Sequence, residues 1–269
     1  MELAERMKKY ERTTEEALVH RMPAILRVDG RAFHTFTKGF DKPFDKILMK
    51  CMEAAALALC EDISSAKIAY GQSDEISVLL VDYDNFNTMQ WFDGNVAKIC
   101  SIAASAATNA FNKCLDKFSN EFAAKSFLGS RDNEEDPDNE MAGFLSGKMF
   151  KAMFDARVFS IPKEDVMNYF LWRRQDAVRN SVASVAQANF SAKTLHGVNI
   201  FGMKKMLLEK GIDWDTMPCR EKEGFYYIKE KFMDGEVERS RWTLLEKSPT
   251  PSWAKSYLHK TIDLQLEKV

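Results

Sequence analysis

Two acidic residues, Asp29 and Asp74, stand where a pair of carboxylates could act together on a charged substrate. Asp29 ends the alternating run AILRVD (24–29), and Asp74 lies in the turn GQSDE (71–75) that precedes the apolar run ISVLLVD (76–82). Neighbouring strands lie about 4.8 Å apart, so two carboxylates at adjacent strand ends can share one or two divalent cations. Oxygen ligands completed by water and phosphate are the set that Mg²⁺ prefers.

The residues next to this pair could complete such a site. The backbone carbonyl of Gly30 is expected as a third ligand, whereas Glu75 is expected to turn to the other side of its strand and to support rather than ligate. The loop 30–34 begins with glycine, and its consecutive backbone N–H groups could hold a phosphate tail. Each turn alone also fits ordinary turn chemistry, because Asp-Gly is common at strand ends. The two acids together favour the functional interpretation.

The elements that must position these residues follow a β-α-β-β-α-β order. The patterns predict a strand over 24–29, a helix near 45–61, a hairpin of 67–70 and 76–82, a helix near 89–116, and a strand over 156–162. This order predicts an α+β fold of the ferredoxin-like, split βαβ type. Right-handed crossovers then place the first strand in the middle of the sheet, beside the hairpin, with both helices on one face.

The rest of the chain is predicted to form a smaller helical and hairpin unit that packs on the split βαβ unit. We expect helices over 163–190 and 200–210, a second hairpin that turns at Asp234-Gly235, and a terminal helix near 252–266. The predicted domains are therefore 1–160, which carries the acidic pair, and 161–269.

Composition excludes some classes of protein but does not indicate which reaction the protein catalyses. The chain has 269 residues, of which 45% are hydrophobic and 29% charged, and its net charge of −2 does not by itself argue for a polyanionic partner. No apolar run reaches the roughly 18 residues of a membrane span, and the charged N-terminal segment is unlike a signal peptide. The acidic stretch RDNEEDPDNE (131–140) is expected to be a solvated, mobile loop.

The cysteines and histidines do not predict a metal or disulfide framework. There are five cysteines without a CxxC pair and four histidines without HxxxH or HxH spacing. Reduced, mostly buried thiols in a cytoplasmic protein are the simpler interpretation.

Four segments together resemble one family. ILRVDGRAFHTF (25–36), IAYGQSDE (68–75), DARVF (155–159) and WRRQDAVRN (172–180) are similar, in order and spacing, to the tRNA-His guanylyltransferase family, especially its prokaryotic guanylyltransferase-like branch. The resemblance covers about residues 5–245. It implies a reverse polymerase that adds nucleotides to the 5′ end of tRNA in the 3′-to-5′ direction, with a catalytic domain like the palm of polymerases and nucleotidyl cyclases.

The resemblance also implies roles for individual residues. Asp29 and Asp74 would be catalytic and, with the Gly30 carbonyl, would bind two Mg²⁺ ions. The implied nucleotide-binding residues, which would take ATP or GTP, are Arg27, Arg31, Ala32, Phe33, His34, Lys42, Asp45, Ser73 and Glu75. The residues expected to bind tRNA are Arg173, Arg174, Asp176, Arg179 and Asn180, within the second unit. Identical subunits would assemble as a tetramer.

One departure from the family pattern bears on the substrate. Eukaryotic members carry a HINN motif where this chain has Val178-Arg179-Asn180-Ser181, and only the asparagine matches. This favours templated repair of truncated tRNA 5′ ends over G addition specific to tRNA-His. Two further alternatives are a nucleotidyl cyclase that uses the same fold without RNA, and an RNA-binding module that has lost catalysis.

Overall fold

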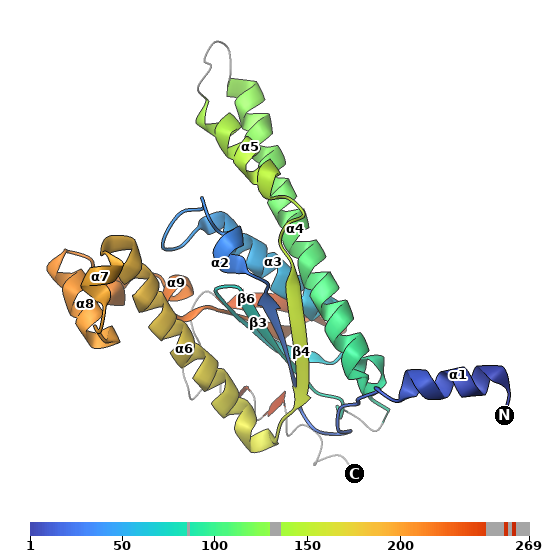
Figure 1. Ribbon diagram of the computed structural model, residues 1–269. Helices are drawn as coiled ribbons and strands as arrows, with labels where there is room; N and C mark the ends of the chain where they lie inside the picture. Colours follow the sequence, from blue (N-terminus) through green and yellow to red (C-terminus); the bar gives the residue numbers. More distant parts are fainter. Residues whose placement is uncertain (85–86, 130–135, 246–255, 258–259, 262–269) are drawn as a thin grey trace.

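Six antiparallel strands form a single sheet in the order β4-β1-β3-β2-β5-β6 (Figure 1). The computed structural model describes residues 1–84, 87–129, 136–245, 256–257 and 260–261. The strands are β1 (Ala24–Gly30), β2 (Ala66–Gln72), β3 (Glu75–Leu80), β4 (Phe154–Ser160), β5 (Phe225–Asp234) and β6 (Val237–Leu245). The β4-β1-β3-β2 half has β1 in its middle and confirms the predicted split βαβ order.

The two faces of the sheet bury different parts of the chain. Leu26 and Val28 of β1 pack with α3 (Lys46–Asp62) and α4 (Val96–Gly129), which both cover one face as predicted. Ile25, on the alternate side of β1, packs with α6 (Lys163–Asn189) on the other face. The alternation in AILRVD therefore separates two cores, and it places Arg27 and Asp29 on the α6 side.

Local sequence explains where the first helices begin and how closely they pack. Asp45 caps α3, because its carboxylate accepts hydrogen bonds from the amides of Ile47 and Leu48. In α4 the fully buried Ala103 and Ala107 have small side chains, which let the helix lie close to the sheet. The short helices α1 (Leu3–Arg12) and α2 (Phe33–Phe36) and the 3₁₀ turn η1 (Trp91–Gly94) complete this part.

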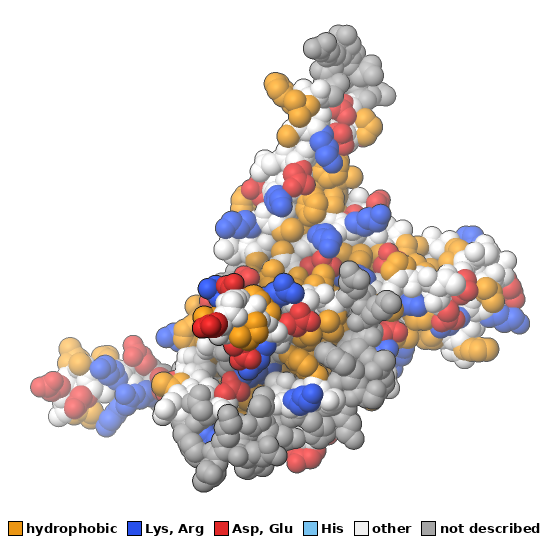
Figure 2. Space-filling view, turned by 180° about the vertical axis from the view of Figure 1, so that it is seen from behind, with side chains coloured by type: hydrophobic (Ala, Val, Ile, Leu, Met, Phe, Trp, Pro, Cys, Tyr) orange, Lys and Arg blue, Asp and Glu red, His pale blue; other side chains and the backbone are white. Residues whose placement is uncertain are grey.

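The segment predicted as an acidic loop is in part helical. Helix α4 continues to residue 129, well past the expected end near 116, and α5 (Pro137–Lys148) packs against it as an arm that extends beyond the sheet (Figure 1). Asp136 caps α5 and Pro137 occupies its first turn, so the acids from 136 onward start a helix rather than extend a loop. The rest of the predicted loop, 131–135, lies outside the described residues. On the face seen in Figure 2, basic and acidic side chains are interspersed along this arm.

The second hairpin joins the same sheet as the first. Strand β5 pairs with β2, with Ala69 opposite Tyr227, and β5 and β6 form the predicted hairpin, which turns at Gly235-Glu236, one residue later than expected. The expected smaller unit therefore shares its hairpin with the sheet of the first unit, because edge strand β2 offers backbone groups for pairing. The division at residue 160 stays a prediction.

Short helices form a lobe at the end of α6. They are α7 (Ala192–Leu195), α8 (Ile200–Glu209), η2 (Trp214–Thr216) and α9 (Cys219–Glu223). Most of the predicted terminal helix, 252–266, falls outside the described residues. Within the described part of the chain, no helix is long and apolar enough to cross a membrane.

Candidate active site

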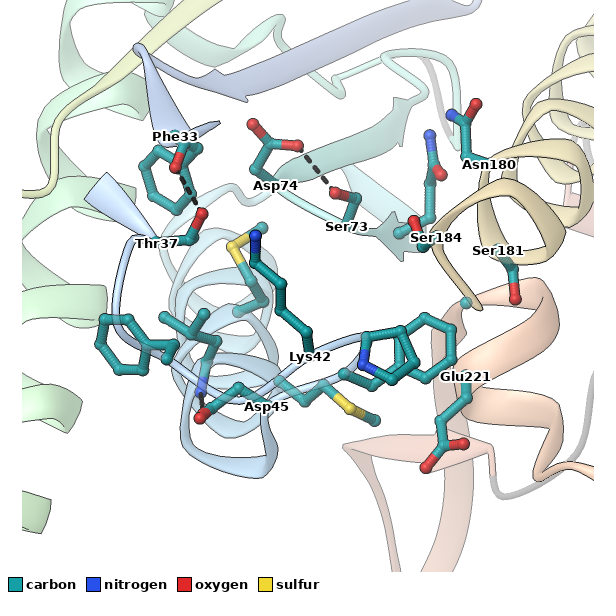
Figure 3. Close-up of a pocket in the computed structure, with 18 of the residues that line it drawn as sticks. Phe33, Thr37, Lys42, Asp45, Ser73, Asp74, Asn180, Ser181, Ser184 and Glu221 are labelled. Atoms are coloured by element: carbon teal, nitrogen blue, oxygen red, sulfur yellow. Dashed lines mark hydrogen bonds between the residues drawn. The ribbon is translucent and has the colours of Figure 1, made fainter. Parts of the chain in front are cut away.

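A cavity of about 460 Å³ opens beside the β2–β3 turn (Figure 3). Its walls come from the segment after β1, the start of α3, the β2–β3 turn, one face of α6, and α9. Segments distant in the chain therefore meet here, and the turn that carries Ser73 and Asp74 forms one side of the cavity.

Asp74 faces this cavity with few protein partners of its own. The Ser73 hydroxyl donates to Asp74 Oδ1 at 2.9 Å, and the Gly30 amide donates to the Asp74 backbone oxygen at 2.9 Å. The second bond ties the end of β1 to the turn. Burial raises the pKa of the Asp74 carboxyl, and the negative charge of Asp29 raises it further. The two carboxylates are thus close enough to affect each other.

Gly30 is required at this junction because an aromatic ring lies against it. A Cβ atom at position 30 would lie 2.4 Å from Cδ2 of Phe33, which is closer than atoms in proteins approach. The Phe33 ring is itself buried against Phe111 of α4 and Phe154 of β4. The glycine in the Asp29-Gly30 pair is therefore a packing requirement as well as a turn residue.

Asp29 belongs to a chain of ion pairs on the α6 face. Arg27 Nη2 lies 3.1 Å from Asp29 Oδ2 and 2.7 Å from Glu75 Oε2. Glu75 stands opposite Asp29 in the β1–β3 register, is only 5% exposed, and receives two bonds from Arg173, at 2.7 and 2.6 Å. Burial raises the Glu75 pKa, while Arg173 and Arg27 counteract this rise.

The donor atoms at the strand ends suit Mg²⁺. Asp29, Asp74 and the Gly30 carbonyl offer only hard oxygen ligands, and a cation there would relieve the repulsion between the two acids. Over the described residues, no group of three or more His, Cys, Asp or Glu side chains could hold a metal. A site here would therefore combine two carboxylates with backbone, water and phosphate oxygens.

Six of the predicted catalytic and nucleotide-binding residues line the cavity: Phe33, His34, Lys42, Asp45, Ser73 and Asp74. Lys42 extends its ammonium group into the cavity, on the side where Asp74 lies (Figure 3). Asp45 lines the cavity but uses its carboxylate as the cap of α3 and to accept a bond from the Asp41 amide. The other predicted residues, which do not line the cavity, are Arg27, Asp29, Gly30, Arg31, Ala32 and Glu75.

The first two backbone amides of the loop after β1 are already hydrogen-bonded within the protein. The amides of Gly30 and Arg31 donate to the backbone oxygens of Asp74 and Met153. Ala32 adopts the left-handed conformation, with φ of +53°, just before α2. A phosphate cradle in this loop would therefore use the amides of residues 32–34.

The residues predicted to bind tRNA divide into buried and exposed members. Arg173 is buried and bonded to Glu75 and Asp176, and Arg174 pairs with Glu223 at 2.7 Å. Their guanidinium groups are thus held by protein carboxylates. Arg179 and Asn180 are exposed, although both contact Asp176, and Asn180 also lines the cavity.

Several residues that line the cavity are not among the predicted site residues. Ser181, Ser184 and Gln187 follow Ala177 and Asn180 along one face of α6, and Arg220 and Lys222 approach from α9. Residues three or four positions apart lie on the same face of a helix. Counting in such steps from the matched segment 172–180 could therefore have identified the α6 residues. No local pattern connects α9 to the cavity.

Comparison with known proteins identifies the family. The sequence model of the tRNAHis guanylyltransferase family matches residues 4–162. The chain belongs to this family. It is accordingly a nucleotidyltransferase, and the resemblance carried by its motifs is confirmed.

Solved structures and curated relatives agree with this family. A bacterial tRNA(His) guanylyltransferase (Thg1)-like protein in complex with ATP superposes with a TM-score of 0.80 at 37% identity, covering 97% of this chain and 99% of that one. Such a bacterial protein in complex with GTP gives a TM-score of 0.74 at 35% identity, covering 97% and 98%. The probable tRNA(His) guanylyltransferase of Dictyostelium discoideum is 25% identical over 83% of this chain and 81% of its own length.

Proposed function

We propose that this protein adds nucleotides to the 5′ end of tRNA in the 3′-to-5′ direction, with the opposite strand as template. The observation that supports this most directly is the arrangement of Asp29 and Asp74 at adjoining strand ends beside a cavity large enough for a mononucleotide. Relatives whose structures hold ATP or GTP support the choice of nucleoside triphosphates as substrates.

Residues in and beside the cavity would have different roles in binding. Asp29, Asp74 and the Gly30 carbonyl would hold two Mg²⁺ ions. Bound there, Mg²⁺ would lower the pKa of the attacking 3′-hydroxyl and neutralise charge on the leaving group. Lys42 offers a positive charge to the triphosphate from across the cavity, and the amides of residues 32–34 offer hydrogen bonds. A 5′-monophosphate end would first be activated with ATP, so that the 3′-hydroxyl displaces AMP.

Arg27 would keep Asp29 in place while the nucleotide binds. Its guanidinium joins Asp29 to Glu75, which the buried Arg173 fixes in turn. One oxygen of Asp29 is engaged by Arg27, which leaves the other for a cation. Within this network Glu75 would act as a positioning residue, because it holds Arg27 against Asp29. Nucleotide binding by Glu75 and Arg27 stays a prediction.

The tRNA would reach the cavity along α6. Arg179 and Asn180 are the exposed members of the predicted set, and Asn180 marks the cavity rim. A homotetramer and a cytoplasmic location are further parts of this proposal. Addition restricted to tRNA-His is the second candidate, and the single match to the HINN motif disfavours it.

An assay of 5′-end addition tests the proposal. Transcripts of several tRNA identities, full-length or shortened by one nucleotide at the 5′ end, would be supplied with mono- or triphosphate ends, Mg²⁺ and each nucleoside triphosphate. We expect the nucleotide that pairs with the opposite strand to be restored on every shortened tRNA, with ATP needed only for monophosphate ends. Addition confined to full-length tRNA-His, or a cyclic nucleotide formed without RNA, would contradict it.

A further inference from the structure

A lysine at the end of α5, in the arm that extends beyond the sheet, is bound to the chain segment that leads into the cavity (Figure 1). Lys148 is the last residue of α5, and its ammonium group donates hydrogen bonds to the backbone oxygens of Phe36 and Lys38, at 2.6 and 2.7 Å. Phe36 ends α2, and the segment 37–42 follows it toward α3. Lys148 itself does not line the cavity. It therefore joins the arm to residues that lie 112 and 110 positions away in the chain.

Three aromatic rings surround this ammonium group. The Nζ atom of Lys148 lies 5.4 to 5.6 Å from the ring centroids of Phe36, Phe40 and Phe144. The centroids of the Phe40 and Phe144 rings are 4.9 Å apart in an edge-on arrangement, and Phe40 is buried. A Cβ atom at Gly39, whose φ is +92°, would lie 2.7 Å from Cε2 of Phe144. The arm and the segment therefore pack tightly around Lys148.

Carbonyl oxygens and ring faces, not a carboxylate, hold the Lys148 ammonium group in the part of the chain that the structure describes. Burial lowers the pKa of Lys148, and the positive charges of Lys151 and Lys38 lower it further. A cation beside other cations needs neutral acceptors, and two of its three N–H groups are used on the two carbonyl oxygens. Loss of the ammonium group would remove this donor from both carbonyl groups at once.

The segment held by Lys148 forms part of the cavity wall. Its wall residues are Thr37, Phe40, Asp41 and Lys42. A second contact holds the far end of the segment, where the Asp41 amide donates to the Asp45 carboxylate at 3.1 Å. Lys42 comes directly after this contact, and its ammonium group extends into the cavity (Figure 3). The position of Lys42 therefore depends on two anchors, one of which belongs to the arm.

We propose that Lys148 is a positioning residue of the nucleotide site, which holds the segment 36–42 so that Lys42 meets the triphosphate. This inference rests on the proposed function, because that function assigns the contact with the triphosphate to Lys42. A loose segment would let the Lys42 ammonium group take many positions, and nucleotide binding would have to restrict them at a cost in entropy. Lys148 should accordingly affect binding of the nucleotide more than the chemical step.

Kinetics of matched lysine variants test this role. Lys148→Met keeps the aliphatic contacts with the rings and removes the charge and the hydrogen-bond donors. We expect the KM for the nucleotide to rise about fivefold with little change in kcat, because the two lost hydrogen bonds act on binding only through the segment. Lys151→Met is the matched control, because the Lys151 ammonium group donates to the nearby Gly147 oxygen, and it should leave KM unchanged. An unchanged KM in Lys148→Met would overturn the proposal.

A double variant shows whether Lys148 acts through Lys42. If it does, Lys148→Met should raise KM little in a protein that already carries Lys42→Ala, because the group to be positioned is missing. Independent roles, or a general loss of structure, would give the same fold-increase in KM in both backgrounds. That result would overturn the assignment of Lys148 as a positioning residue.

Limited proteolysis measures the hold on the segment without any substrate. Trypsin cleaves after lysine, and the carbonyl group of the exposed Lys38, which belongs to the bond to be cut, accepts from Lys148. We expect severalfold faster cleavage after Lys38 in Lys148→Met, and in Lys148→Gln should the first variant not fold. An unchanged rate would refute the hold, whether or not the protein adds nucleotides. Absence of nucleotide addition by the unaltered protein would instead refute the proposed function.

Discussion

Asp74 and Glu75 are neighbours in the chain, yet they occupy opposite kinds of surroundings. Asp74 borders the cavity and receives one side-chain hydrogen bond, from Ser73. Glu75 is buried on the α6 face, where Arg27 and Arg173 surround it. One turn can therefore carry one carboxylate that is available to a ligand and a second whose oxygens are bonded within the protein. Substitutions on each side of the turn can test that separation.

Removal of the Asp74 charge should have the largest effect on activity. We expect Asp74→Asn to lower nucleotide addition by roughly a thousandfold, about 4 kcal/mol, because Mg²⁺ would lose a ligand. Its melting temperature should not fall, and should rise slightly at neutral pH, since burial disfavours the charged form that the substitution removes. Single-turnover assays and thermal unfolding measure both. Asp41→Asn, an exposed acid on the same cavity, is the control, and near-normal turnover in Asp74→Asn would refute the role of Asp74.

Loss of a buried partner of Glu75 should act on stability instead. Arg173→Met leaves Glu75 with Arg27 as its remaining cationic partner, and we expect the free energy of unfolding to fall by about 3 kcal/mol. Urea unfolding followed by circular dichroism measures this. Arg157→Met, which breaks an exposed pair with Asp155, should cost less than about 1 kcal/mol. Equal losses in the two variants would show that the buried Arg173–Glu75 pair contributes no more to stability than the exposed Arg157–Asp155 pair.

Lys42 should matter for binding of the triphosphate and not for folding. Lys42→Ala is expected to raise the KM for the nucleotide about tenfold, because a hydrogen bond to a charged group is worth about 1.5 kcal/mol or more. Steady-state kinetics with a triphosphorylated tRNA end would show it. Lys46→Ala, an exposed lysine in the first turn of α3 that does not line the cavity, is the matched control. An unchanged KM would exclude contact between Lys42 and the nucleotide.

The smallest effect should appear in the dependence of stability on pH. The raised pKa of Asp74 means that the folded state holds a proton that the unfolded state loses, so stability falls as pH rises from 3.8 through the raised pKa. Asp74→Asn removes this loss. The variant should therefore gain stability relative to the unaltered protein at neutral pH, and the gain should vanish below pH 3.8. Urea unfolding at several pH values measures it, and a gain that does not vary with pH would contradict it.

The ends of the first strands and their order could be predicted because each depends on local patterns. Alternation in AILRVD fixed which residues of β1 face each core, and the turns at Asp29-Gly30 and Ser73-Asp74 marked the strand ends. The part of the acidic stretch from residue 136 onward is helical although its charge favours a solvated loop, because Asp136 and Pro137 form a helix start that packing against α4 stabilises. There the helix-capping residues, and not the net charge, determine the local structure.

Residue types at short spacings were enough to predict the acidic pair, the split βαβ order and the family. The folded structure was needed to see that Glu75 belongs to a buried network, that Arg173 is buried, and that α6 and α9 form walls of the cavity. These facts depend on contacts between residues about 100 positions apart, such as Arg173 with Glu75. Pairing across such distances depends on how the sheet and helices pack, which no local pattern specifies.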